Sequence, residues 1–292
     1  MVRPEVLYPA ASRLAESAMW HVATGSIFWL DLLDCTLSRH DLPTGETATF
    51  PVDIPVQLGA LVATSDPSRL LVSGSTGISV IRLDGTVERT LADPEGGRDA
   101  IGYNDCKMDR FGRLWFGTHH LPETEPRGVL WSLRGGGPAQ IADAGFPVSN
   151  GPAVSPDGRR LYFNDSVGRR TFVYDLDPDD PQPRNRRVFA EHTEGLPDGA
   201  TVDAEGGLWV AFWAGSRVAR FSPDGKVTDT ISLPCPNVTS VAFAGDDLAT
   251  LVITTAREGM TEAELAEHPE AGHIFTCAPG HIGLAEPLFD LR

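Results

Sequence analysis

The chain has 292 residues and a net charge of −16, from 40 acidic and 24 basic side chains. This balance disfavours binding to nucleic-acid phosphates or anionic membranes and favours divalent cations and neutral small molecules. No apolar run approaches the roughly 18 residues of a membrane span, and the first residues lack the apolar core of a secretory signal. We therefore expect a cytoplasmic globular protein, a monomer or weak homodimer, without nucleic-acid or membrane partners.

Short strand-like segments bounded by Gly or Asp-Gly turns recur along the whole chain at a spacing of about 40–48 residues. Each is followed by a small-residue turn and a second strand. The first strands of the units begin near Gly25, Arg69, Gly112, Gly158, Gly206 and Asp246. Six such units predict an all-β protein, a six-bladed β-propeller with four-stranded blades and a single domain over residues 1–292.

Two segments near the chain ends have distinct roles in this prediction. Residues 261–268 form the one convincing helix, because Thr261 is a good N-cap, Glu264 follows three residues later and Pro269 ends the pattern. Residues 5–8 predict a strand that completes the open edge of the last blade, since an unpaired blade edge is a liability in a closed ring.

The stretch from Leu196 to Trp213 suggests where the function lies. Pro197-Asp-Gly199 predicts a tight turn, residues 200–202 predict a short buried strand, and Glu205-Gly-Gly207 predicts a second turn. Asp198 is therefore expected at the mouth of a strand. Taken alone, such a residue is usually only a turn former.

Three other polar residues occupy equivalent places, just before or at the start of an inner strand: Glu16, Asn104 and Asn150. The innermost strands of a propeller line its central channel, so these side chains and Asp198 should converge on the axis. Two carboxylates and two amide oxygens suit a hard divalent cation, with Ca²⁺, Mg²⁺ or Mn²⁺ preferred over a softer metal.

Other apparent motifs carry less weight. His119 and His120, with Glu123 nearby, lack the HExxH spacing of zinc enzymes, and we expect them in a loop that faces the channel mouth. Serine-hydrolase chemistry is disfavoured because the chain contains no Gly-x-Ser-x-Gly sequence. The four cysteines are widely scattered without a CxxC pair, which is typical of buried thiols.

Five segments resemble the senescence marker protein / gluconolactonase / luciferin-regenerating-enzyme family, also called regucalcin-like. They are Leu14-Ala-Glu-Ser-Ala-Met-Trp20, Asn104-Asp-Cys-Lys-Met-Asp-Arg-Phe-Gly-Arg-Leu-Trp-Phe-Gly-Thr118, Ser149-Asn-Gly-Pro-Ala-Val-Ser-Pro-Asp157, Pro197-Asp-Gly-Ala-Thr-Val-Asp-Ala-Glu-Gly-Gly-Leu-Trp-Val-Ala211 and Arg257-Glu-Gly-Met-Thr-Glu-Ala-Glu-Leu265. The resemblance runs nearly end to end.

The resemblance implies one divalent cation held by Glu16, Asn150 and Asp198, with Asn104 contacting water or substrate. Ca²⁺ is the first choice, and Mg²⁺, Mn²⁺, Zn²⁺ or Fe²⁺ are alternatives. The sequence departs from the family at Gly102, where an Arg usually contacts the substrate, and at Cys106, which replaces a Gly. The missing Arg predicts a pocket that is roomier and less charged on that side.

These observations lead to the interpretation of the chain as a metal-dependent lactone hydrolase acting on sugar or other small lactones. Asp198 is the expected general base, and Asn104, Tyr103, His119 and His120 are the expected substrate contacts. Two alternatives remain open: a propeller phosphotriesterase with a similar all-oxygen cation site, and a calcium-binding protein without turnover.

Overall fold

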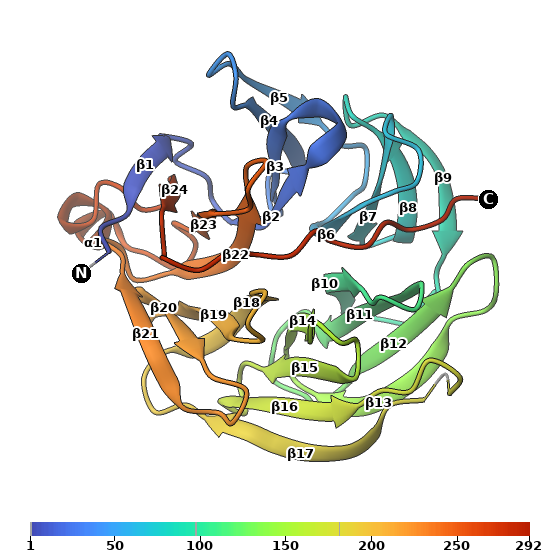
Figure 1. Cartoon of the computed structure of the whole chain (residues 1–292). Coiled ribbons are helices and arrows are strands. Elements are labelled where there is room, and N and C mark those ends of the chain that lie inside the picture. Colours follow the sequence, from blue (N-terminus) through green and yellow to red (C-terminus); the bar gives the residue numbers. More distant parts are fainter. Residues whose placement is uncertain (1, 97, 181) are drawn as a thin grey trace.

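The computed structural model describes residues 2–96, 98–180 and 182–292. Within these ranges the strands form six four-stranded antiparallel sheets arranged in a ring, which confirms the predicted six-bladed propeller (Figure 1). Blade 1 contains β2 (Ala15–His21), β3 (Ser26–Asp31), β4 (Thr36–Asp41) and β5 (Thr47–Pro51). Blade 2 contains β6 (Leu58–Ala63), β7 (Arg69–Gly74), β8 (Gly77–Arg82) and β9 (Val87–Ala92).

The remaining blades repeat this meander. Blade 3 contains β10 (Ile101–Met108), β11 (Arg113–His120), β12 (Gly128–Arg134) and β13 (Gln140–Phe146). Blade 4 contains β14 (Ser149–Val154), β15 (Arg160–Asp165), β16 (Arg170–Asp175) and β17 (Arg184–Glu191). Blade 5 contains β18 (Leu196–Val202), β19 (Leu208–Trp213), β20 (Arg217–Phe221) and β21 (Val227–Ser232).

The last blade closes the ring with strands from both ends of the chain. It contains β22 (Val238–Ala244), β23 (Thr250–Thr255), β24 (Ile274–Cys277) and, as its outermost strand, β1 (Glu5–Tyr8). β1 pairs antiparallel with β24, with Glu5 opposite Thr276. The predicted ring closure is therefore confirmed, and the edge that β24 would otherwise expose is covered.

Helices contribute little to the described chain. A 3₁₀ turn covers Val22–Thr24, and α1 spans Glu262–Glu267. The predicted capping box is confirmed, because the side chain of Thr261 accepts from the Glu264 amide while the Glu264 carboxylate accepts from the Thr261 amide. No helix in the described ranges is long and apolar enough to cross a membrane.

Every innermost strand carries a register irregularity at a comparable place. The interruptions lie between Glu16 and Met19, Leu58 and Leu61, Tyr103 and Cys106, Asn150 and Ala153, Pro197 and Ala200, and Val238 and Ser240. A β-bulge bends its strand and redirects a side chain. The predicted turn at residues 197–199 is thus wrong: β18 already begins at Leu196, and Asp198 lies within the strand, in its bulge.

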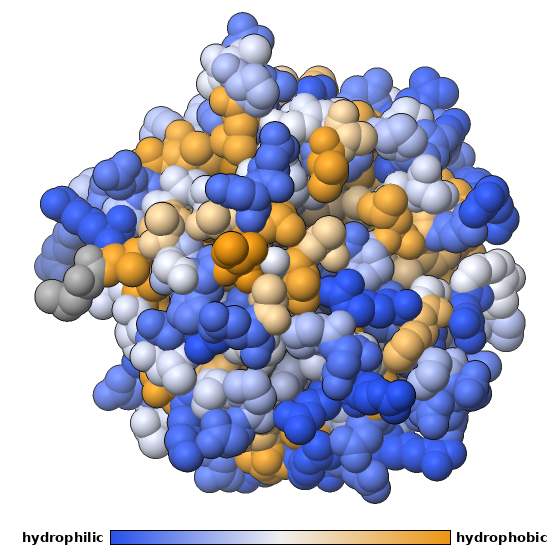
Figure 2. Space-filling model, in the orientation of Figure 1, coloured by the Kyte–Doolittle hydropathy of each residue, from blue (hydrophilic) through white to orange (hydrophobic). Residues whose placement is uncertain are grey.

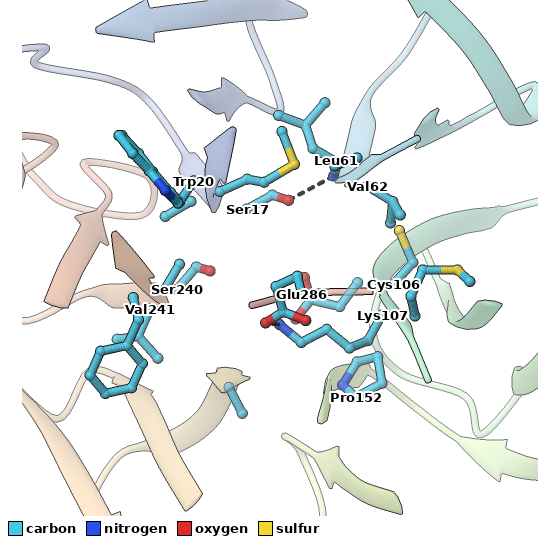
Figure 3. A pocket seen from close by; sticks show the side chains of 18 of the residues that line it. Ser17, Trp20, Leu61, Val62, Cys106, Lys107, Pro152, Ser240, Val241 and Glu286 are labelled. Carbon is cyan, nitrogen blue, oxygen red and sulfur yellow. Dashed lines mark hydrogen bonds and ion pairs between the residues drawn. The ribbon is translucent and has the colours of Figure 1, made fainter. Parts of the chain in front are cut away.

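The C-terminal segment, residues 283–292, crosses one end of the central channel (Figure 1). It is bonded to blade 5 through Gly283 and Asp203 and to blade 2 through Phe289 and Thr64. Figure 3 shows Glu286 of this segment facing Lys107 of β10 inside the channel. Figure 2 shows that apolar side chains gather near the middle of this face, and the exposed Ile282 and Leu288 lie in or beside the segment. The pocket at the opposite end of the channel, called the open end, is lined by no residue of this segment.

Candidate functional site

The open end of the channel contains a pocket of about 440 Å³. Its walls include one polar residue from each of four innermost strands: Glu16 of β2, Asn104 of β10, Asn150 of β14 and Asp198 of β18. The structure therefore brings together the four residues that the strand pattern singled out. All four are at the bulges, where the pairing of each inner strand with its neighbour is interrupted and the side chains can turn toward the axis.

Hydrogen bonds decide which atom of Asn150 faces the pocket. The hydroxyl of Ser166 donates to the carbonyl oxygen of Pro197 over 2.6 Å, and a carbonyl can only accept. Ser166 Oγ must then accept from Asn150 Nδ2, 3.1 Å away. The amide nitrogen of Asn150 is thereby used, and Oδ1, which also accepts from Nδ2 of Asn104 over 2.6 Å, has one lone pair left for the site.

The same reasoning orients Asn104. Its amide nitrogen donates to the carbonyl oxygen of Ser149 over 2.8 Å and to Oδ1 of Asn150 over 2.6 Å. Both donor hydrogens of the amide are consumed by these two acceptors. Oδ1 of Asn104 is left to accept from water or from a hydroxyl group of a ligand.

Three carboxyl groups are crowded around the axis. Burial raises the pKa of Glu16, and the charges of Asp198 and Asp105 raise it further. Burial likewise raises the pKa of Asp198, with added repulsion from Asp105 and Glu123. Burial also raises the pKa of Asp105, whereas the hydrogen bond from the Gly151 amide and the charge of Lys107 lower it by less. Such mutual repulsion among buried acids costs free energy that a bound cation would offset.

The donor set of the pocket fits a hard divalent cation. Glu16, Asp198 and Asn150 each offer an oxygen, and no Lys or Arg belongs to the described pocket wall. Among residues 2–96, 98–180 and 182–292, no three His, Cys, Asp or Glu side chains gather as a metal cluster. The arrangement is thus two carboxylates with an amide oxygen, which suits Ca²⁺, Mg²⁺ or Mn²⁺ better than a thiolate- or imidazole-seeking ion.

The two histidines end strand β11 instead of lying in the predicted loop. His119 lines the pocket, with Nε2 3.5 Å from the Gln57 amide nitrogen, and burial lowers its pKa to about 4. His119 is therefore neutral at pH 7 and contributes no positive charge. His120 is turned away from the pocket, because its Nδ1 accepts from the amide of Glu125 over 3.1 Å.

Tyr103 lies in the hydrophobic core of its blade and is 1% exposed. Its hydroxyl donates to Asp93 over 2.7 Å and accepts from the Glu95 amide over 3.0 Å. The hydroxyl thus uses both its donor hydrogen and an acceptor lone pair inside the blade, and Tyr103 does not line the pocket.

The surroundings of Gly102 correct one expectation. A Cβ atom at this position would lie within 2.7–2.8 Å of Gln57, Leu121 and His119. The space is filled by these three side chains, so the pocket is not roomier on that side, although it is free of cationic side chains. Gln57 and Leu121 were not predicted, because neither belongs to a polar motif and both reach the pocket only through the fold.

Comparisons with known proteins point in one direction. Residues 14–257 match the model of a family described as the SMP-30/Gluconolactonase/LRE-like region. The chain is 37% identical to 6-deoxy-6-sulfogluconolactonase of Pseudomonas putida, over 95% of each chain. It is 32% identical to L-arabinolactonase of Azospirillum brasilense, over 97% of this chain and 94% of that protein.

The structure also superimposes on that of a calcium-binding protein, regucalcin, from Agrobacterium tumefaciens. The TM-score is 0.93 at 27% sequence identity, over 99% of this chain and 97% of the other. The likeness extends over the complete ring of blades.

Proposed function

Because the chain belongs to the SMP-30/gluconolactonase/LRE-like family, we propose that it is a lactonase that opens neutral sugar lactones with the help of one divalent cation. The observation that carries this proposal is the convergence of Glu16, Asn150 and Asp198 on one pocket free of Lys and Arg. The lactonase names of two relatives that align over nearly their whole length support the same reaction class.

Glu16, Asn150 and Asp198 would hold the cation, and Ca²⁺ is our first choice because the donors are all oxygen. When bound, a divalent cation polarises an ester carbonyl and makes a nearby water more acidic. The cation also supplies the positive charge that the crowded carboxyl groups lack.

Asp198 would act as the general base. Its carboxylate takes a proton from the water that attacks the lactone carbonyl, and it returns that proton to the ring oxygen as the acyl C–O bond breaks, so that a hydroxy acid is released. The free oxygen of Asn104 accepts from a substrate hydroxyl, and neutral His119 forms a second polar wall.

The charge of the pocket favours neutral substrates over anionic ones. Four carboxylates line it, those of Glu16, Glu123, Asp198 and Glu258. Arg13 lies 3.7 Å from Glu258, and one divalent cation would balance two of the other three charges. Trp213 adds an apolar wall that suits the face of a sugar ring. The relative named for a sulfonated lactone acts on an anion, and the residues of this pocket offer no cationic partner for such a group.

The test is turnover of D-glucono-lactone, L-arabino-lactone, 6-deoxy-6-sulfogluconolactone and a phosphotriester, each with and without added Ca²⁺, Mg²⁺ or Mn²⁺. We expect metal-dependent opening of the two neutral lactones, with kcat/KM for the sulfonated lactone lower by about tenfold or more. Hydrolysis of the phosphotriester alone would favour the alternative enzyme, and tight Ca²⁺ binding without any turnover would favour a calcium-binding protein.

A cytoplasmic location, which we also propose, agrees with four free cysteines.

A further inference from the structure

Blade 4 holds the backbone of Asp198 through a chain of three side chains. Nδ2 of Asn164, on β15, lies 2.6 Å from the carbonyl oxygen of Asp198. Thr171 Oγ1, on β16, lies 2.7 Å from Asn164 Oδ1, and Nε2 of His192 lies 2.8 Å from the same hydroxyl. All three side chains are buried, at 0%, 1% and 7% exposure. This series of hydrogen bonds therefore runs inside the protein, from blade 4 to the strand of blade 5 that carries Asp198.

The donor and acceptor roles in this series of hydrogen bonds can be assigned in only one way. The Asp198 carbonyl can only accept, so Asn164 donates to it through Nδ2 and presents Oδ1 to Thr171. Thr171 then donates its single hydroxyl hydrogen to Asn164, and its oxygen must accept from His192 Nε2–H. The tautomer of His192 is thereby fixed, and every hydrogen bond points toward Asp198.

Asp198 needs such support because its own blade does not supply it. β18 and β19 are out of register between Pro197 and Ala200, so the bulge interrupts the ladder at Asp198. The neighbouring blade also approaches closely: a Cβ added at Gly151 would lie 2.5 Å from the Asp198 carbonyl oxygen. The Ser166 hydroxyl clamps the preceding carbonyl, that of Pro197, over 2.6 Å.

The same device recurs beside two other residues of the site. The hydroxyl of Thr239, on β22, donates over 2.6 Å to the carbonyl oxygen of Ala15, which precedes Glu16. The hydroxyl of Ser73, on β7, donates over 2.8 Å to the carbonyl oxygen of Asn104. The preceding blade thus fixes the bulged strand in each case, but a chain of three side chains occurs at Asp198.

We propose that Asn164, Thr171 and His192 are positioning residues that hold the bulge of β18 so that the Asp198 carboxylate keeps its catalytic orientation. This inference rests on the proposed function of Asp198 as base. None of the three touches the substrate, and each acts through the next. A displacement of a catalytic group by about 1 Å can cost up to ~10²-fold in rate. Loss of these hydrogen bonds should therefore lower kcat and leave KM nearly unchanged.

The central test is Thr171→Val, which keeps the shape of the side chain and removes the hydroxyl that joins Asn164 to His192. Thr171→Ser restores a hydroxyl at the same place. Tyr174→Phe is the matched control, because Tyr174 lies on the same strand, is similarly buried as a residue, and loses a hydroxyl whose bond goes to Asp143 over 2.8 Å, away from β18. Each variant is assayed on D-glucono-lactone at saturating Ca²⁺, at a temperature where circular dichroism shows it folded.

We expect Thr171→Val to lower kcat about tenfold or more with KM within about twofold, whereas Thr171→Ser and Tyr174→Phe stay within about twofold of the parent in kcat. A parental kcat in Thr171→Val, an unrescued loss in Thr171→Ser, or an equal loss in Tyr174→Phe would overturn the proposal. If the parent opens no lactone, the proposed function fails, and Ca²⁺ affinity by calorimetry decides the positioning role. Weaker binding in Thr171→Val alone supports it, and equal binding in Thr171→Val, Tyr174→Phe and parent overturns it.

Discussion

The ammonium group of Lys107 lies 2.6 Å from the carboxylate of Glu286, across the end of the channel that the C-terminal segment covers (Figure 3). Lys107 belongs to β10, whose Asn104 lines the pocket at the other end. The two side chains are 19% and 41% exposed, so water screens their attraction. The pair connects the C-terminal segment to the inner strand, but most of the anchoring must come from elsewhere.

We expect that anchor to be Phe289. Its ring is 2% exposed in the core of blades 2 and 3, and its backbone bonds to Ala63 and Ser65 over 3.0 and 2.8 Å. Phe289→Ala should lower the free energy of unfolding by about 3–5 kcal/mol, the usual cost of such a cavity. Glu286→Gln should lower it by less than about 1 kcal/mol. Urea denaturation of both variants checks this ranking, and the reverse order would show that the ion pair holds the segment.

The N-terminal strand should be required for the stability of the whole ring. Removing residues 1–10 deletes the pairing of β1 with β24 and the contact of Tyr8 with Trp29, whose ring centres are 5.8 Å apart. We expect a loss on the order of several kcal/mol, since each backbone hydrogen bond contributes about 1 kcal/mol. Thermal melting of the truncated chain measures it, and an unchanged Tm would contradict the closure role of β1.

The blade architecture could be predicted because it depends on local signals. Glycine turns at a regular spacing mark the hairpins, and the Thr261–Glu264 capping box marks α1. The edge position of β1 followed from the physical need to close the ring. The bulges could not be predicted in the same way, because the Pro197-Asp198-Gly199 step has the composition of a turn, and only the partner strand shows that the ladder resumes at Ala200.

The pocket was predictable only in part for a related reason. The equivalent positions of Glu16, Asn104, Asn150 and Asp198 are visible in the repeat. The repeat does not show the direction in which a side chain points from a strand end. This direction distinguishes His119, which lines the pocket, from its neighbour His120, which does not. The filling of the space beside Gly102 depends on Gln57 of another blade, which no local pattern signals.

Acidification should destabilise the protein partly through His192. Burial, and to a smaller extent the charge of Arg217, lower its pKa from an ordinary value near 6.5 to about 4. The unfolded chain therefore binds a proton as the pH falls below about 6.5 while the folded chain does not, so stability is lost between pH 6.5 and 4. At about 1.4 kcal/mol per unit, His192 accounts for up to about 3 kcal/mol.

The measurement is urea denaturation of the parent and of His192→Gln at pH 7 and pH 4.5. Gln keeps a donor for Thr171 but cannot be protonated. The variant should lose less stability than the parent over this interval, by about 2–3 kcal/mol. Equal losses in the two proteins would show that His192 is protonated in the folded state.

Divalent cations should stabilise the fold through the pocket. Removing the cation leaves the buried carboxyl groups of Glu16, Asp198 and Asp105 repelling one another. Ca²⁺ at 100 times its dissociation constant should add about 2.7 kcal/mol to the free energy of unfolding and raise the Tm, and a chelator should reverse this. The control is Asp198→Ala, in which the rise should be largely lost. An equal rise in that variant would place the ion elsewhere on the acidic surface.

We assign two roles to Asp198, cation ligand and general base, and one role, cation ligand, to Glu16. Asp198→Asn keeps an oxygen ligand of nearly the same shape but removes the proton acceptor, which typically costs on the order of 10²–10⁴ in rate. Glu16→Gln should weaken cation binding while leaving the base in place. The most direct measurement is turnover of a neutral sugar lactone against Ca²⁺ concentration for both variants and the parent. We expect Glu16→Gln to recover most of the parental rate at saturating Ca²⁺ and Asp198→Asn to stay at least about 10²-fold slower. Recovery of the parental rate by Asp198→Asn would show that Asp198 is a ligand and not the base.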